Sequence, residues 1–224
     1  MGVTPGHPRD NQQHEHDRIT MHGILHEVFH FFTHLDKGFP YTLKSLISAP
    51  GRMQHDYVEG KRDHHQKPFS MFFVCATISA LAYYWVNTAI VKYYDAGDAG
   101  EVSFFHQYMV FTLLGLIPIL ALLTWLFFLK SGYNYAEVLV QQLYTFSFLI
   151  LMLAAIQTLK FLWPHMETRW VELPLILIYC MQTNIHFFMK EQKVAVIFKT
   201  ILAASLGFSF ATFVQDSLIK LLGH

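Results

Sequence analysis

The sequence predicts an all-α polytopic integral membrane protein, with about five transmembrane helices behind an amphipathic, cytoplasmic N-terminal helical region. Its composition is the first reason. The chain is 53% apolar and only 14% charged, with a mean hydropathy of +0.31, whereas a soluble domain is nearer a quarter charged. The second reason is the uneven distribution of charge. The first 68 residues carry eight of the sixteen Lys and Arg residues, and the remainder is dominated by Leu, Ile, Phe, Tyr and Ala.

Three regions follow from this distribution. Residues 1–17 are predicted to be a flexible, His-rich lead-in, because they are rich in Pro, Gly, Gln and Asn without any periodicity. Residues 18–68 are predicted to form a cytoplasmic or interfacial region of amphipathic helices, broken at Pro50-Gly51. Residues 69–224 are predicted to form a transmembrane helical bundle.

Apolar runs long enough to cross the hydrocarbon core predict five spans. The predicted spans are 69–91, 108–129, 138–160, 173–189 and 194–214. The fourth is short and carries Gln182, Asn184 and His186, so a four-span alternative stays open. Lys and Arg counts favour a cytoplasmic N-terminus, because that orientation places eleven of these residues inside and four outside.

Basic residues gather just before the first predicted span. They are Arg52, Lys61, Arg62 and Lys67. Basic side chains at the cytoplasmic surface attract anionic lipids, so these four are predicted to contact anionic headgroups. Plain positive-inside anchoring is the alternative interpretation. The formal net charge is zero, which gives no reason to expect a nucleic-acid partner.

Histidines recur every fourth residue in the N-terminal region. His22, His26, His30 and His34 share one face of a predicted helix, and residues 26–30 read H-E-x-x-H. In a zinc-binding helix with this pattern, the two histidines hold the metal. The glutamate, here Glu27, polarises a bound water. The four histidines are therefore candidate ligands for zinc or iron, and Glu27 is a candidate catalytic residue. A solvated polar face and a pH-sensing face are the alternatives.

Polar side chains within the predicted spans indicate a pore or a polar path through the bundle. The residues that could line it are Asn87, Gln141, Gln142, Gln157, Gln182, Asn184, His186 and Lys199. The last four are the candidate site residues. Ionisable groups within a membrane mark functional positions by default. The alternative is that these side chains only form hydrogen bonds between helices.

The chain resembles an uncharacterised bacterial multi-pass membrane family, a domain of unknown function whose members often carry an N-terminal zinc ribbon. The resemblance rests on residues 18–20, 25–30, 34–38, 42–43, 50–51, 57–62 and 67–69, with a weaker similarity at 135–140. Both cysteines, Cys75 and Cys180, fall in predicted spans, so the zinc ribbon is absent. The resemblance implies a juxtamembrane helical region followed by a small bundle in the bacterial inner membrane. It implies no activity.

Three classes of function are compatible with these observations. The first is a non-enzymatic, homo-oligomeric inner-membrane protein whose juxtamembrane helices contact lipid or protein partners. The second is a channel or small-solute permease that uses the polar residues of the last spans. The third is a metal-dependent membrane hydrolase built on the H-E-x-x-H stretch.

Overall fold

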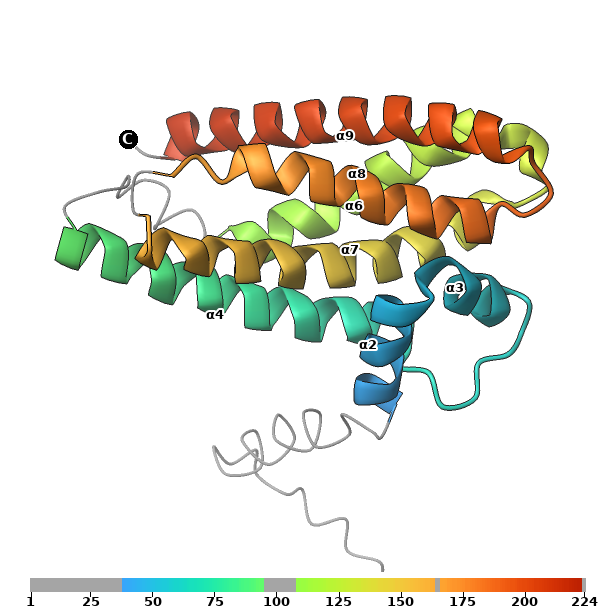
Figure 1. The fold of residues 1–224 in the computed structure, drawn as a ribbon, viewed down its shortest axis with the longest axis horizontal. Coiled ribbons are helices and arrows are strands. Elements are labelled where there is room, and N and C mark those ends of the chain that lie inside the picture. The colour runs from blue at the N-terminus through green and yellow to red at the C-terminus, as the bar shows by residue number, and fades with distance from the viewer. Residues whose placement is uncertain (1–37, 95–107, 164–165, 223–224) are drawn as a thin grey trace, which may run out of the picture. The chain divides into compact units, whose positions relative to one another are not determined.

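The computed structural model describes residues 38–94, 108–163 and 166–222. The fold below is that of residues 37–224, which form one compact unit. Its described residues are helical almost throughout and contain no strand, which confirms the all-α prediction (Figure 1). The helices are α2 (Gly38–Ser48), α3 (Pro50–Val58), α4 (Pro68–Tyr94), α6 (Met109–Phe127), α7 (Tyr135–Gln157), α8 (Arg169–Phe187) and α9 (Lys193–Leu222), with short 3-10 turns η1 (Leu129–Ser131) and η2 (Thr158–Phe161).

The five long helices, α4 and α6 to α9, run back and forth between two ends. Helices α2 and α3 pack at the first end, which we call the cap end. One buried cluster lies there, formed by Phe128, Tyr133, Phe187 and Val196. This cluster joins the end of α6, the start of α7, the end of α8 and the start of α9. The other end is called the far end.

Contacts at the far end join the opposite termini of the same helices. Gln157 Nε2 donates to Asn87 Oδ1 at 3.1 Å, which ties the end of α7 to α4. Arg169 at the start of α8 pairs with Asp216 near the end of α9, with 3.7 Å between their charged groups. Successive long helices are therefore antiparallel.

Four described helical segments are long and apolar enough to cross a membrane: Pro68–Tyr94, Val110–Phe127, Tyr135–Phe161 and Lys193–Leu218. They indicate an integral membrane protein. Helix α8, at the position of the fourth predicted span, is not among them, because Arg169, Glu172 and its side-chain amides lower its hydropathy. It nevertheless begins at the far end and finishes at the cap end, as the contacts of Arg169 and Phe187 show.

The outer surface of the bundle is apolar, as expected for helices in lipid. Large exposed side chains on α6 and α9 include Phe111, Ile119, Leu122, Leu126, Val194, Phe198, Leu206 and Phe213. Helix α7 is the most buried of the four candidate spans. It contacts α2, α3, α4, α6 and α8, so it is the central element of the bundle.

Helix α7 begins three residues before the predicted span, at a capping box. The Asn134 side chain accepts a hydrogen bond from the Glu137 backbone N–H at 2.9 Å, and the Glu137 carboxylate accepts one from the Asn134 N–H at 2.8 Å. These bonds satisfy two backbone donors that a helix start would leave unpaired. Gly132, with φ of +87°, provides the left-handed residue that ends the preceding 3-10 turn.

Helices α2 and α3 are fixed to the cap end by close packing and tyrosine hydrogen bonds. A Cβ atom on Gly51 would lie 2.0 Å from the Thr183 carbonyl oxygen, so α3 touches the backbone of α8 directly. The Tyr179 hydroxyl donates to the Leu46 carbonyl at 3.2 Å, and the Tyr144 hydroxyl donates to the Gln66 carbonyl. Pro50, expected as a helix breaker, is the first residue of α3, where proline is well tolerated.

Candidate functional site

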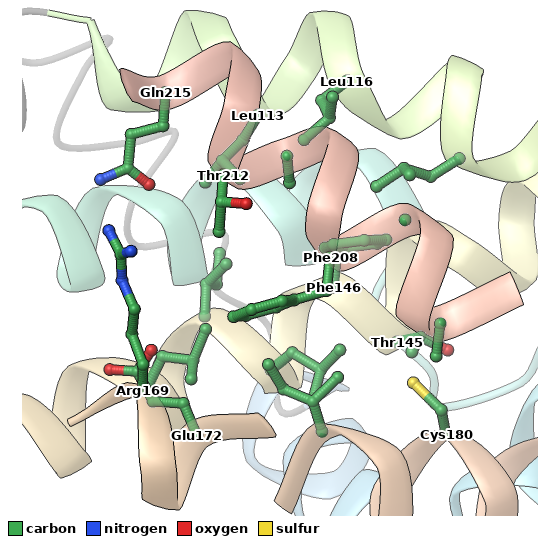
Figure 2. A pocket seen from close by; sticks show the side chains of 18 of the residues that line it. Leu113, Leu116, Thr145, Phe146, Arg169, Glu172, Cys180, Phe208, Thr212 and Gln215 are labelled. Atoms are coloured by element: carbon green, nitrogen blue, oxygen red, sulfur yellow. The ribbon is translucent and has the colours of Figure 1, made fainter. Parts of the chain in front are cut away.

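A cavity of about 690 Å³ lies between α6, α7, α8 and α9, with Tyr83 of α4 also in its wall. Figure 2 shows it from close by. It reaches along most of the bundle, because its lining includes both Arg169 and Asn184, and α8 rises about 22 Å between these two residues.

The character of the lining changes along this length. At the far end it is charged, and the residues are Lys160, Glu167, Arg169 and Glu172. In the middle, Figure 2 shows Phe146 of α7 and Phe208 of α9 between the polar ends. At the cap end the polar lining residues carry amides and hydroxyls without formal charge: Thr124, Gln142, Thr145, Asn184 and Thr200.

Buried hydrogen bonds connect the helices at the cap end of the cavity. The Gln141 side-chain Nε2 donates to Asn184 Oδ1 at 3.1 Å, and Asn184 Nδ2 donates to Thr200 Oγ1 at 3.0 Å. These bonds join α7 to α8 and α8 to α9. Separately, Gln142 Nε2 donates to Thr124 Oγ1 at 2.8 Å and joins α7 to α6. Such bonds hold helices together within a bilayer.

The α3 helix reaches this network through Gln54. The Thr145 hydroxyl lies 3.3 Å from Gln141 Nε2 and 3.4 Å from Gln54 Oε1. Thr145 lines the cavity and Gln54 does not, so Gln54 contacts the cavity wall from behind. We call Gln54, Gln141, Thr145, Asn184 and Thr200 the polar network.

Comparison with known proteins adds one finding. Residues 36–80 match the family model of a protein of unknown function (DUF3667). The matched segment comprises α2, α3, the loop after α3 and the first part of α4, and it confirms the resemblance to an uncharacterised family. No curated protein and no solved structure matches the chain. The DUF3667 segment thus contributes Gln54 to the polar network, while the helices that form most of the cavity lie outside it.

Of the four predicted pore residues, Asn184 lines the cavity and belongs to the polar network. Gln182 and His186 are exposed, and His186 Nδ1 lies 2.9 Å from the Gln182 carbonyl oxygen. Lys199 forms an ion pair with Glu191 in the turn between α8 and α9, and its ammonium lies over the Phe128 ring, 5.1 Å from the centroid.

Gln141 is a second network residue that the sequence singled out, as an amide within a predicted span. Gln54, Thr145 and Thr200 were not predicted. A signal for Thr145 existed in the sequence, because it lies one helical turn after Gln141 and therefore shares a face of α7 with it.

The four predicted lipid-contacting residues are all exposed. Lys61 pairs with the Asp56 carboxylate at 3.0 Å, and this contact lowers the pKa of Asp56. Arg62 Nε donates to the Tyr57 carbonyl at 3.3 Å, and its guanidinium lies over the Tyr57 ring. Their contact with anionic headgroups stays a prediction.

Five predicted site residues lie outside the described residues: the metal ligands His22, His26, His30 and His34, and the catalytic Glu27. Within the described ranges, no three His, Cys, Asp or Glu side chains are grouped so that they could hold a metal ion.

Proposed function

We propose that this protein is a small-solute permease whose solute occupies the cavity between α6, α7, α8 and α9. The observation that carries the proposal is the polar lining of a cavity among membrane-spanning helices. Its volume of about 690 Å³ falls in the range of small-molecule sites, which are mostly apolar with a few well-placed polar groups. Placing a polar group within the membrane costs free energy, so such groups are concentrated at functional positions.

The charge distribution supports an orientation for the permease. Among the described residues, nine Lys and Arg lie at the cap end: Lys44, Arg52, Lys61, Arg62, Lys67, Lys130, Lys190, Lys193 and Lys199. Four lie at the far end: Lys92, Lys160, Arg169 and Lys220. The positive-inside rule then makes the cap end cytoplasmic, and the charged end of the cavity faces the outside.

A second candidate function is lipid contact by the α2–α3 region, which the sequence favours. The supporting observation is that Arg52 and Lys67 are exposed and, within the described part of the chain, form no ion pair with an acidic side chain. This interpretation does not explain a polar cavity inside the bundle, so the permease is preferred. Self-association of the bundle stays a prediction from the sequence.

Osmotic swelling of proteoliposomes tests the permease. The purified protein is reconstituted into liposomes, which are mixed with a hypertonic solution of glycerol, erythritol, glycine or sodium acetate. The liposomes first shrink, and their re-swelling as the solute enters is followed by light scattering. We expect at least one of these solutes to enter faster than it enters protein-free liposomes. Ala211→Phe, which fills the cavity, should abolish the difference, because Ala211 lies in the lining.

The matched control is Ala155→Phe, which adds the same side chain at an exposed position of α7 outside the lining. It should leave the swelling rate unchanged. Equal swelling rates for the wild type, Ala211→Phe and protein-free liposomes would contradict the permease.

A further inference from the structure

We propose that the far end of the cavity binds the charged head of an amino acid-like zwitterion, whose ammonium group pairs with Glu172 and whose carboxylate pairs with Lys160. This inference rests on the proposed permease function and specifies the chemical class of its solute. It is carried by two partly buried side chains of opposite charge that both line the cavity and do not pair with each other.

The far end of the cavity carries equal numbers of positive and negative groups. The lining there includes two basic and two acidic residues: Lys160, Arg169, Glu167 and Glu172. Arg169 and Glu167 are exposed, and Arg169 already pairs with Asp216. Lys160 and Glu172 are partly buried, and neither forms an ion pair with any other described residue. These two side chains are therefore the charges that a solute in the cavity can pair with.

A buried hydrogen bond fixes the two charges close to one contact between helices. The Thr168 hydroxyl lies 3.5 Å from Gln157 Oε1 and joins the start of α8 to the end of α7, and both side chains line the cavity. Lys160 follows Gln157 by one turn of η2, and side chains one 3-10 turn apart lie above each other. Glu172 follows Thr168 by one α-helical turn and shares its face of α8. The two charges thus lie within one turn of the same contact, yet too far apart for an ion pair.

Glu172 is the deepest charge in the cavity. Along α8 it lies about 4.5 Å closer to the cap end than Arg169, and Figure 2 shows both residues at the cavity wall. Between Glu172 and the polar network, the described lining contains no charged side chain. Phe146 and Phe208 lie in this middle part. The succession suits a solute with a charged head at the far end and an apolar side chain in the middle.

A solute with one charge, or with none, suits the far end less well. An anion would leave Glu172 without a counter-charge, and a cation would do the same to Lys160. A partly buried charge that loses its hydration without gaining a partner is unfavourable. A zwitterion satisfies both side chains at once through charge-assisted hydrogen bonds. A free amino acid and the head group of a zwitterionic lipid share this chemistry.

Protection of a cysteine beside Glu172 tests the inference. Ile176 lines the cavity one helical turn closer to the cap end, and Ile176→Cys is made in a Cys75→Ser/Cys180→Ser background. The full-length protein in phosphatidylglycerol nanodiscs is treated with methyl methanethiosulfonate, an uncharged reagent, and modification is followed by mass spectrometry.

The competing probes share one carbon skeleton and differ in charge. They are L-leucine, isocaproate, which lacks the amino group of leucine, and isopentylamine, which lacks its carboxylate. We expect leucine to protect the introduced cysteine at concentrations at least about tenfold below those of the other two, because each of them forgoes one hydrogen-bonded charge pair.

Two variants assign the two charges separately. In Glu172→Gln, leucine should protect no better than isocaproate, because its ammonium group has lost its partner. In Lys160→Gln, leucine should protect no better than isopentylamine, because its carboxylate has lost its partner. Lys92→Gln is the matched control, since Lys92 is an exposed far-end lysine outside the lining, and it should retain the preference for leucine.

The lipid of the nanodiscs separates the two sources of the zwitterion. Protection by leucine in phosphatidylglycerol identifies a free amino acid. If phosphatidylethanolamine protects the introduced cysteine without any probe, whereas phosphatidylglycerol does not, the head group of a zwitterionic lipid occupies the site.

Two results would contradict the inference, and they differ in what they say of the permease. If leucine protects no better than isocaproate or isopentylamine, and the two lipids behave alike, the zwitterion site is wrong while the permease stands on its swelling assay. If the introduced cysteine reacts only after denaturation in both lipids, the cavity is closed to solutes and both proposals are wrong.

Discussion

Gly51 allows α3 to approach α8 more closely than any other residue would. A Cβ atom at this position would lie 2.0 Å from the Thr183 carbonyl oxygen and 2.8 Å from His186 Cβ. We predict that Gly51→Ala forces the helices apart and lowers the free energy of unfolding by at least about 2 kcal/mol, as overpacking of a tight contact does. Thermal unfolding of the purified protein measures this.

Gly115→Ala in α6 is the matched control. Its Cβ meets nothing within 4 Å, and alanine is the better helix former by about 1 kcal/mol. The unfolding temperature of this variant should stay the same or rise. If both variants behave alike, the close α3–α8 contact does not exist in the protein.

His65 gives the cap end a pH dependence. Burial lowers the pKa of this imidazole below 6.5, the nearby His64 lowers it further, and the Asp56 carboxylate partly opposes the shift. The folded protein therefore holds His65 neutral, beside the Thr42 hydroxyl at 3.4 Å and the Tyr41 ring. As the pH falls below 6.5, the unfolded chain takes up a proton that the folded protein resists, so the free energy of unfolding decreases.

We predict that the unfolding temperature of the wild type falls more between pH 7.5 and 5.5 than that of His65→Gln, which has a similar size and does not titrate. Identical pH profiles for the two proteins would show that His65 does not contribute.

At the residue scale, the sequence identified two members of the polar network and missed the others for a physical reason. Asn184 and Gln141 are conspicuous as amides within predicted spans. Gln54 lies 91 residues before Thr145, in a polar segment where a glutamine carries no signal. Its burial depends on α3 packing against α7 and α8, which helical periodicity cannot reveal.

At the scale of elements, α8 shows where hydropathy and geometry diverge. Its apolarity is too low for a candidate span, yet it joins the far end to the cap end between α7 and α9. The polar residues that lower its hydropathy include Glu172 and Asn184, which line the cavity. A helix that faces a polar cavity can cross a membrane with fewer apolar residues than one surrounded by lipid.

We predict that α8 crosses the membrane, so its two ends label from opposite sides. Glu167→Cys and Lys190→Cys, both at exposed positions, are made in a Cys75→Ser/Cys180→Ser background and treated with an impermeant maleimide. In intact cells only Glu167→Cys should react, and Lys190→Cys should need permeabilised cells. Reaction of both from one side would mean that α8 does not cross.

At the scale of the whole molecule, the all-α membrane fold was predictable because hydropathy sums over each run of residues and needs no knowledge of packing. The positions of the long helices were likewise close to the predicted spans. The cavity was not predictable, because it depends on which faces of α6, α7, α8 and α9 meet. Single residues such as Thr145 and Thr200 become a site only after these helices pack together.

A permease of this kind requires a cavity that water-soluble molecules reach inside a membrane bundle. The most direct test is the reactivity of the two native cysteines in membranes that contain the full-length protein. Cys180 lines the cavity, whereas Cys75 is fully buried in the core outside it. With a small water-soluble methanethiosulfonate, we predict that Cys180 is modified and that Cys75 reacts only after denaturation. If Cys180 is as unreactive as Cys75 until the protein unfolds, the cavity is closed to solutes and the permease is contradicted.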